Sequence, residues 1–229
     1  MYYRLVLCLL LFSTPFCKAQ STLGESRTSE STNVEYLISL PKDYKTDGQG
    51  SPMILFLHGG DRSNTKHHPK KYAAEAGIVF GFMVVAPKCA SGCNWSTLNF
   101  DALLTEVTSE FNVDKTRIYI TGYSYGGYGT WSAISKYPQW FAAAVPIAGG
   151  GNTDIVCNAK NVAVWAFHGD KDSVTSYTQS KKLIGKLQAC EAKAKLETFE
   201  GADHWIWPSI YKDQRLYDWL SKQTKTQSH

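Results

Sequence analysis

The feature that most constrains the fold of this 229-residue chain is a regular alternation of short apolar runs with helical patterns. Residues 53–57 form a continuous apolar run, which is typical of a strand buried on both faces of a parallel sheet. Residues 97–111 carry apolar side chains at the spacing of an amphipathic helix. The same patterns predict strands at residues 33–40, 78–86, 117–121, 141–147, 162–167 and 195–199, and helices at residues 67–77, 125–137, 175–190 and 208–222. This alternation predicts a single α/β domain with a mostly parallel, doubly wound sheet.

The start of the chain has the pattern of a secretory signal peptide. Within residues 1–19, Arg4 precedes an apolar run at residues 5–12, and a small residue ends the segment. A lipid anchor at Cys17 fits poorly, because the bulky Phe16 precedes it. The sequence therefore predicts a secreted or periplasmic protein.

The remaining composition limits the class of protein. Residues 20–33 are polar and rich in Ser and Thr, so we expect a loose leader there and the folded domain at residues 34–229. The whole chain has 24 Lys and Arg against 20 Asp and Glu, a formal charge of +4 without a basic run, which argues against a nucleic-acid partner. No apolar stretch approaches the roughly 18 residues of a membrane-spanning helix, so we expect no membrane span.

Four cysteines lie beyond the predicted signal peptide, an even number that is compatible with two disulfides in an exported chain. Cys89 and Cys93 share one loop. Cys157 precedes a predicted strand, and the helix after that strand ends at Cys190. We predict the pairs Cys89–Cys93 and Cys157–Cys190. No histidine lies near them at the spacing of a zinc finger, so no metal site is expected.

The segment Gly122-Tyr123-Ser124-Tyr125-Gly126 fits the pattern G-x-S-x-G between a predicted strand and a predicted helix. Glycines on both sides let the strand and the helix approach each other. The serine hydroxyl is then held above the carboxyl ends of the parallel strands, where ligands bind in open α/β sheets. It also lies at a helix N-terminus, which favours a developing negative charge. Ser124 is therefore the predicted nucleophile.

A serine nucleophile needs a base, usually a histidine oriented by a carboxylate, and with this turn the chain order is Ser, then Asp or Glu, then His. His204 follows the last predicted strand and is the predicted base. The other histidines have other expected roles. His58 belongs to the glycine loop after residue 57, and His168 is expected to order its own turn. His67 and His68 are expected to be solvated in a polar loop, and His229 is the terminus.

Three aspartates compete for the role of the acid. Asp203 is next to His204 in the sequence, and adjacent side chains rarely meet in the required geometry. Asp170 and Asp172 both follow the predicted strand at residues 162–167. Asp172 has the better spacing for reaching over the sheet edge, whereas Asp170 suits a brace of the turn. Asp172 is the first choice and Asp170 the alternative.

A tetrahedral intermediate needs two preorganised N–H donors, which form an oxyanion hole. One is expected from the backbone of Tyr125, the residue after the nucleophile. The other is expected from the loop that begins His58-Gly59-Gly60, with Gly60 the first choice and Asp61 the second.

Together these motifs resemble the α/β-hydrolases described as predicted peptidases or carboxylesterases, near the prolyl-oligopeptidase, feruloyl-esterase and polyhydroxybutyrate-depolymerase groups. The resemblance implies the α/β-hydrolase fold, with Ser124, Asp172 and His204 as the catalytic triad. One departure is Asp203, which stands where the family often has glycine. The matching segments cover nearly all of the chain after residue 50 and are residues 55–60, 85–89, 95, 117–131, 141–147, 164–169 and 216–220.

The spacing of the predicted triad limits the shape of the site. The 48 positions from Ser124 to Asp172 are nearly filled by one helix and two strands, so we expect no lid or a minimal one. An open site suits the end or the side chain of a polymer better than a buried lipid. Trp95, Tyr123 and Trp205 are the predicted substrate contacts, because aromatic rings stack on sugars and aromatic acyl groups.

The sequence thus predicts a secreted serine esterase that acts without a cofactor through an acyl-enzyme. Its expected substrates are short acyl esters, or acetyl and feruloyl esters linked to carbohydrate, on small molecules or polymers. A serine peptidase of the prolyl-oligopeptidase type is the first alternative, although the chain lacks the large extra domain of gated oligopeptidases. A non-catalytic carbohydrate- or lipid-binding protein is the second, and the intact Ser, Asp and His argue against it.

Overall fold

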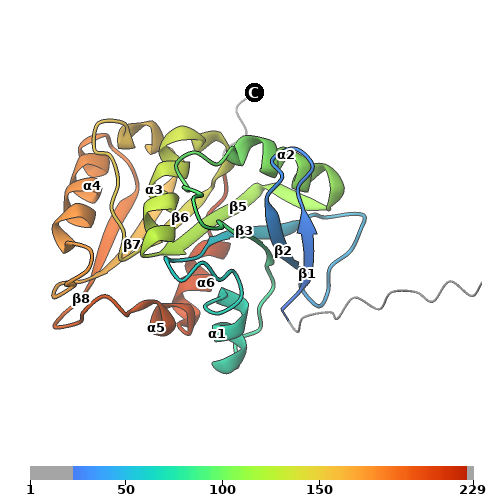
Figure 1. Ribbon diagram of the computed structural model, residues 1–229, viewed down its shortest axis with the longest axis horizontal. Coiled ribbons are helices and arrows are strands. Elements are labelled where there is room, and N and C mark those ends of the chain that lie inside the picture. Colours follow the sequence, from blue (N-terminus) through green and yellow to red (C-terminus); the bar gives the residue numbers. More distant parts are fainter. Residues whose placement is uncertain (1–22, 226–229) are drawn as a thin grey trace, which may run out of the picture.

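The computed structural model describes residues 23–225, which form an eight-stranded sheet with helices on both faces (Figure 1). The predicted signal peptide at residues 1–19 lies outside the described residues. The strands are β1 (Glu25–Thr28), β2 (Glu35–Ser39), β3 (Ser51–Leu57), β4 (Met83–Pro87), β5 (Val113–Tyr123), β6 (Ala143–Ile147), β7 (Ala163–Gly169) and β8 (Ala194–Phe199). The helices are α1 (Pro69–Glu75), α2 (Phe100–Glu110), α3 (Tyr125–Lys136), α4 (Tyr177–Ala189), α5 (Trp207–Tyr211) and α6 (Gln214–Ser221), with short 3₁₀ turns η1 (Pro138–Trp140) and η2 (Val156–Ala159).

The strand order is β1-β2-β4-β3-β5-β6-β7-β8. β2 runs antiparallel to both β1 and β4, whereas the strands from β4 to β8 are parallel to one another. This is the predicted α/β-hydrolase architecture. The order reverses between β3 and β5, the place where ligands bind in open α/β sheets.

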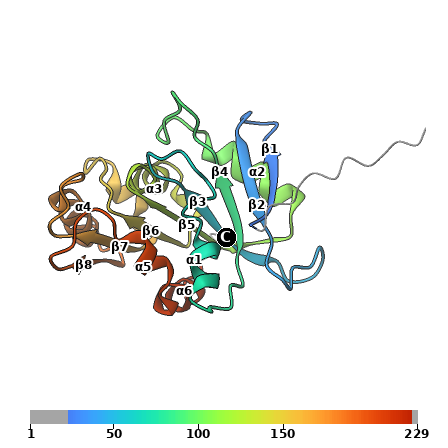
Figure 2. The same cartoon turned by 60° about the horizontal axis from the view of Figure 1, so that its bottom comes forward.

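Two hydrophobic cores cover the two faces of the sheet. Apolar side chains of α2, α3 and α4 form one core with the sheet, and those of α1, α5 and α6 form the other. Figure 2 brings α1, α5 and α6 to the front and shows that they share one side of the sheet. The sheet is therefore buried on both faces, as its continuous apolar strands predict.

The N-terminal segment differs from the sequence-based expectation. Residues 20–33 were expected to be a loose leader, but Glu25–Thr28 forms β1 and pairs in register with β2. The four residues of β1 are polar and lie at the sheet edge, and their burial pattern is mostly exposed. Polar composition therefore did not distinguish an edge strand from a loop, because the backbone makes the sheet contacts.

The predicted strand at residues 78–86 is shorter in the structure, since β4 begins at Met83. Phe80 and Phe82 instead pack their rings against Tyr217. The predicted helix at residues 208–222 is divided into α5 and α6, because Asp213 begins a new helix by accepting a hydrogen bond of 2.9 Å from the Arg215 N–H. Residues 148–162, between β6 and β7, contain η2 and no larger insertion, so any lid is minimal.

Candidate active site

The turn between β5 and α3 holds Ser124 in a strained backbone conformation, with φ 52° and ψ −119°. Few residues other than glycine adopt a positive φ, and such strain is concentrated at functional sites. A Cβ at Gly122 would collide with the Gly126 carbonyl, and a Cβ at Gly126 would collide with the Leu57 carbonyl. The flanking glycines of the motif are therefore required by the close approach of α3 to β3 and β5.

The structure brings Ser124, His204 and Asp172 together in one hydrogen-bonded series. His204 Nε2 lies 2.9 Å from Ser124 Oγ, and His204 Nδ1 lies 2.7 Å from Asp172 Oδ2. Because a carboxylate only accepts hydrogen bonds, the proton of the neutral imidazole belongs on Nδ1. Nε2 is then free to accept the hydrogen of the serine hydroxyl. This arrangement can remove a proton from Ser124 as its oxygen attacks an electrophile.

The carboxylate of Asp172 is fully buried, and both of its oxygens have partners. Oδ1 accepts hydrogen bonds from the backbone N–H groups of Val174, at 2.9 Å, and Thr175, at 2.7 Å. Oδ2 lies 2.7 Å from His204 Nδ1 and 3.1 Å from His168 Nε2. A buried charge is tolerated only where such donors replace water. The four contacts fix the carboxylate in one orientation.

His168 is a neighbour of the acid that the sequence pattern did not reveal. Its side chain is fully buried on β7, and burial lowers its pKa, so the ring is neutral. Nε2 lies 2.9 Å from the Thr175 carbonyl as well as near Asp172, and both of these oxygens are acceptors. The proton therefore belongs on Nε2. His168 was expected only to order its own turn, but it also faces the carboxylate that holds His204.

The other two candidate acids connect the loop after β7 with the loop after β8. Asp170 Oδ1 accepts a hydrogen bond of 2.7 Å from the Gly201 N–H. Asp203 Oδ1 accepts from the N–H of Ser173 at 2.8 Å and from its hydroxyl at 2.9 Å. The backbone hydrogen bond from Ser173 is the largest cause of the lowered pKa of the Asp203 carboxyl. These bonds hold the loop of the acid against the loop of His204.

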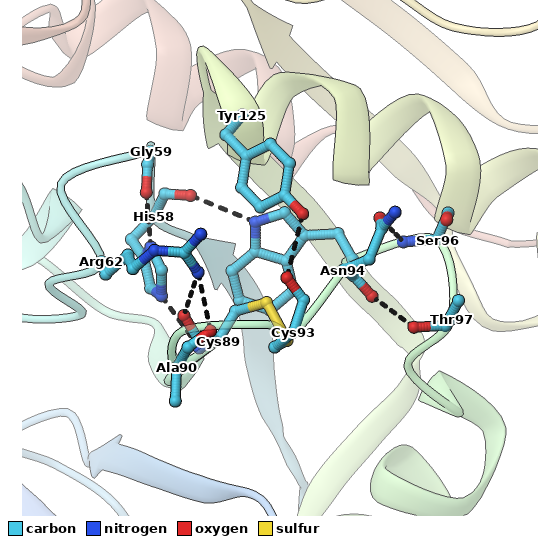
Figure 3. The surroundings of a disulfide bond; sticks show 11 residues. His58, Gly59, Arg62, Cys89, Ala90, Cys93, Asn94, Ser96, Thr97 and Tyr125 are labelled. Carbon is cyan, nitrogen blue, oxygen red and sulfur yellow. Dashed lines mark hydrogen bonds between the residues drawn. A yellow bond between two sulfur atoms is a disulfide. The ribbon is translucent and has the colours of Figure 1, made fainter.

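The loop after β3 is held in place by His58, as Figure 3 shows. The Cys89 N–H donates to His58 Nε2 at 2.9 Å, so Nδ1 carries the proton and donates to the Gly59 carbonyl at 2.7 Å. Burial lowers the pKa of His58, which keeps this neutral form. The Trp95 indole donates to the His58 carbonyl at 3.2 Å. Arg62 at the far end of the loop donates to the carbonyls of the Cys89 turn.

The two expected oxyanion donors occupy different surroundings. Tyr125 is the first residue of α3, so its N–H has no acceptor within the helix. Gly60 is exposed, and a Cβ there would meet no atom within 4 Å. The neighbouring Asp61 is also exposed, and its carboxylate accepts a hydrogen bond of 2.8 Å from the Tyr123 hydroxyl.

Of the predicted substrate contacts, only Trp205 presents a large exposed surface, with 60% of the residue accessible. Tyr123 is 2% exposed and stacks on Trp207 with 4.3 Å between ring centroids, so the prediction that it contacts substrate is wrong. Trp95 is 1% exposed and mainly supports the His58 loop, although it also forms part of a cavity wall. In both cases the composition could not separate a core ring from an exposed ring.

His67 and His68 were expected to be solvated, and the structure shows that both are buried. His68 is the N-cap of α1, where its Nδ1 accepts from the Lys70 N–H at 3.2 Å. Burial lowers its pKa to about 3. His67 contacts the rings of Tyr72 and Trp205. The polar neighbours in the sequence concealed both roles.

The structure contains both predicted disulfides, Cys89–Cys93 and Cys157–Cys190. Within residues 23–225, no group of three or more His, Cys, Asp and Glu side chains is placed to hold a metal ion. No helix in the same part of the chain is both long enough and apolar enough to cross a bilayer.

Part of the chain, including the site, matches a protein-family model. Residues 95–207 match the model of the dienelactone hydrolase family. Ser124, Asp172 and His204 all fall inside this match.

Several of the similar proteins are described as esterases. The chain is 28% identical, over 65% of its length and 24% of the relative, to the bifunctional acetylxylan esterase/xylanase XynS20E of Neocallimastix patriciarum. It is 23% identical to "Probable feruloyl esterase C" of Aspergillus niger, over 87% of this chain and 78% of that protein. The crystal structure of a thermostable esterase matches with a TM-score of 0.73 and 32% identity, over 89% of this chain and 63% of the other. The chain thus spans about a quarter of the first relative.

Proposed function

We propose that this chain, an α/β-hydrolase whose residues 95–207 match the dienelactone hydrolase family, hydrolyses carboxylic esters through a serine nucleophile. The observation that carries the proposal is the position of His204, with Nε2 2.9 Å from Ser124 Oγ and Nδ1 2.7 Å from Asp172 Oδ2. Similarity to acetylxylan and feruloyl esterases supports acyl groups carried on carbohydrate as the substrates.

In the proposed reaction, His204 Nε2 takes the proton of Ser124 while Oγ attacks the ester carbonyl. The oxyanion that forms is stabilised by the N–H groups of Tyr125 and Gly60. When the tetrahedral intermediate collapses, the C–O bond to the alcohol breaks and His204 gives its proton to the departing alkoxide. The acyl group stays on Ser124 until water, activated by His204, attacks it and releases the acid.

The role of Asp172 follows from its buried, four-partner environment. It keeps the His204 proton on Nδ1 and stabilises the imidazolium that forms during each transfer. Its own position is fixed from the opposite side by two backbone N–H groups and by His168. The enzyme requires no cofactor for these steps.

We also propose that the protein acts outside the cytoplasm. The two disulfides are typical of an oxidising compartment. The signal-peptide pattern at residues 1–19 supports export.

The test compares the wild type with Ser124→Ala on p-nitrophenyl acetate, butyrate and laurate, methyl ferulate, acetylated xylan and an amide analogue. We expect hydrolysis of the short acyl or carbohydrate-linked esters by the wild type, and a loss of several orders of magnitude in Ser124→Ala. Activity that survives in Ser124→Ala would refute the mechanism. Preferential cleavage of the amide would indicate a peptidase, and no activity on any substrate would favour a binding protein.

A further inference from the structure

A cavity of about 530 Å³ lies along α3, and Tyr125, the residue after the nucleophile, forms part of its wall. Tyr125, Tyr128, Ser132 and Lys136 lie at helical spacing on one face of α3 and line this cavity. Tyr125 is next to Ser124, and Lys136 is eleven residues further, which corresponds to about 16 Å along the helix axis. The cavity therefore extends away from the reacting atoms for a distance longer than an acetyl group needs.

Two loops complete the walls of this α3 cavity. One contains Asn94, Trp95 and Ser96, between β4 and α2. The other contains Asn152 and follows β6. Both loops connect the carboxyl end of a parallel strand to the next element, so the cavity opens on the same side of the sheet as Ser124.

The amides of the cavity are oriented by their own loops. Asn94 Oδ1 accepts from the Ser96 N–H at 2.9 Å, as Figure 3 shows, and Asn152 Oδ1 accepts from the Asp154 N–H at 2.8 Å. Both residues are exposed. Each bond uses the amide oxygen and leaves the amide NH₂ group to donate to a ligand.

The aromatic groups of the cavity are also fixed and keep hydrogen-bonding capacity. Tyr125 donates to the Cys93 carbonyl at 3.1 Å, so its oxygen can still accept a hydrogen bond. The Tyr128 hydroxyl accepts from Gln179 Nε2 at 2.9 Å and can still donate. The indole N–H of Trp131, another lining residue, has no hydrogen-bond partner among residues 23–225.

This combination matches the chemistry of a pyranose chain. Sugar rings have apolar C–H faces that pack on aromatic rings and hydroxyl edges that pair with amides and phenols. Within the described part of the chain, Lys136 is the one charged residue that lines the cavity, and its Nζ is engaged with the Ser96 carbonyl at 2.6 Å. Among the described residues, the other polar groups of the cavity wall are uncharged amides and hydroxyls, which suit the hydroxyl groups of a ligand.

We propose that the α3 cavity is a glycan subsite, which binds pyranose rings of the polymer whose hydroxyl carries the scissile ester. The inference rests on the proposed esterase function and assigns the part of the structure that holds the carbohydrate. The ester then lies at Ser124, and the neighbouring rings extend along Tyr125 and Tyr128.

The binding experiment uses Ser124→Ala protein and xylotetraose, cellotetraose and mannotetraose, none of which carries an ester. Calorimetry measures affinity, and the ¹⁵N–¹H resonance of the Trp131 indole reports on the cavity itself. We expect at least one tetrasaccharide to bind and to shift this resonance. The glycan subsite would be overturned if none of the three tetrasaccharides bound at millimolar concentration. It would also be overturned if ferulate shifted the indole resonance and no tetrasaccharide did.

The kinetic experiment compares acetylated xylotetraose with p-nitrophenyl acetate. We expect Tyr128→Ala and Asn152→Ala to lower the ratio of kcat/KM between the two substrates by about three- to tenfold, since each removes one packing or hydrogen-bonding contact. Tyr128→Phe, which keeps the ring, is expected to lose less than Tyr128→Ala. Asn161→Ala, an exposed asparagine outside the cavity, is the control and should leave the ratio unchanged.

The two proposals fail in different ways. A wild-type protein that cleaves neither substrate would refute the esterase function, whatever the tetrasaccharides do. A wild type that cleaves p-nitrophenyl acetate, with the substrate ratio unchanged in both cavity variants, would refute the glycan subsite alone. Thermal melting of each variant identifies losses that come from unfolding.

Discussion

Replacing Asp172 by asparagine tests how the buried acid controls His204. In the wild type, Oδ1 accepts two backbone N–H groups, from Val174 and Thr175. An asparagine at this position must place its carbonyl oxygen there, because an NH₂ group would face two donors. Its NH₂ group then takes the place of Oδ2, where it can donate to His204 Nδ1 and faces one donor, the Nε2–H of His168, instead of two.

The consequence is a change of tautomer in His204. Nδ1 becomes an acceptor for the new NH₂ group, so the ring proton moves to Nε2, which faces Ser124 Oγ at 2.9 Å. A protonated Nε2 cannot take the serine proton. We expect kcat to fall by roughly 10³- to 10⁴-fold, the loss typical of a wrong tautomer in such a triad. This loss corresponds to about 4–5.5 kcal/mol of transition-state stabilisation.

The assay is steady-state hydrolysis of p-nitrophenyl acetate at pH 7.5, with Asp170→Asn as the matched control. Asp170 accepts one bond from the Gly201 N–H, which an asparagine oxygen can also accept. We therefore expect Asp170→Asn to lose less than about threefold in kcat. The reasoning is refuted if Asp172→Asn retains more than a tenth of the activity, or if the two variants lose activity equally.

Four further predictions concern stability. Removing Cys157–Cys190, which closes a separation of 33 residues, is expected to lower the free energy of unfolding by about 3–4 kcal/mol and to leave p-nitrophenyl acetate hydrolysis intact. Removing Cys89–Cys93 should lower the free energy of unfolding by less, about 2 kcal/mol, but should reduce kcat because the Cys89 N–H holds His58. Urea titration and steady-state kinetics of the two double serine variants test both predictions. His68 has its pKa lowered to about 3 by burial, so the unfolded chain takes up the extra proton first as the pH falls below about 6.5. The contribution of the neutral His68 to the free energy of unfolding is complete above about pH 6.5 and is lost toward pH 3; at pH 4.5 the loss is about 2–3 kcal/mol. The difference in unfolding free energy between pH 7 and pH 4.5 should therefore be smaller in His68→Gln than in the wild type. An unchanged difference would contradict the assignment. Gly126→Ala, which drives a Cβ into the Leu57 carbonyl, should yield little folded protein, whereas Gly185→Ala, with open space around it, should melt near the wild type.

The sequence was sufficient to predict the strands and helices whose apolar residues follow a regular local pattern. The apolar strands, the glycines around Ser124 and the order of Ser, Asp and His are local patterns, so the fold and the three residues that meet could be predicted. One disulfide could be predicted because Cys89 and Cys93 share a loop. The other followed from the order of elements, because Cys157 and Cys190 flank a strand and a helix that pack as neighbours. Contacts between segments far apart in the chain carry no such local pattern.

Most of the errors are of one kind, although the division between α5 and α6 is local and comes from the N-cap Asp213. The position of β1 depends on pairing with β2, and the burial of His67 and His68 depends on rings contributed by distant elements. Tyr123 is hidden because α5 brings Trp207 over it. For β1, His67 and His68, the polar neighbours in the sequence predicted exposure. For Tyr123, the proximity to the nucleophile predicted it. In each case a long-range contact overrode the local pattern.

The three aspartates show why local reasoning still found the site. Asp170 and Asp203 each join the loop after β7 to the loop after β8, and Asp172 lies between these two connections with His204 as its partner. The carboxylates that compete for one role in the sequence therefore have complementary roles in the structure. Two hold the loops at a fixed separation, and the third uses that separation to orient the base. A substitution at Asp203 should accordingly act through the distance between Asp172 and His204, raising mobility of the His204 loop, rather than through the chemistry of the proton transfer.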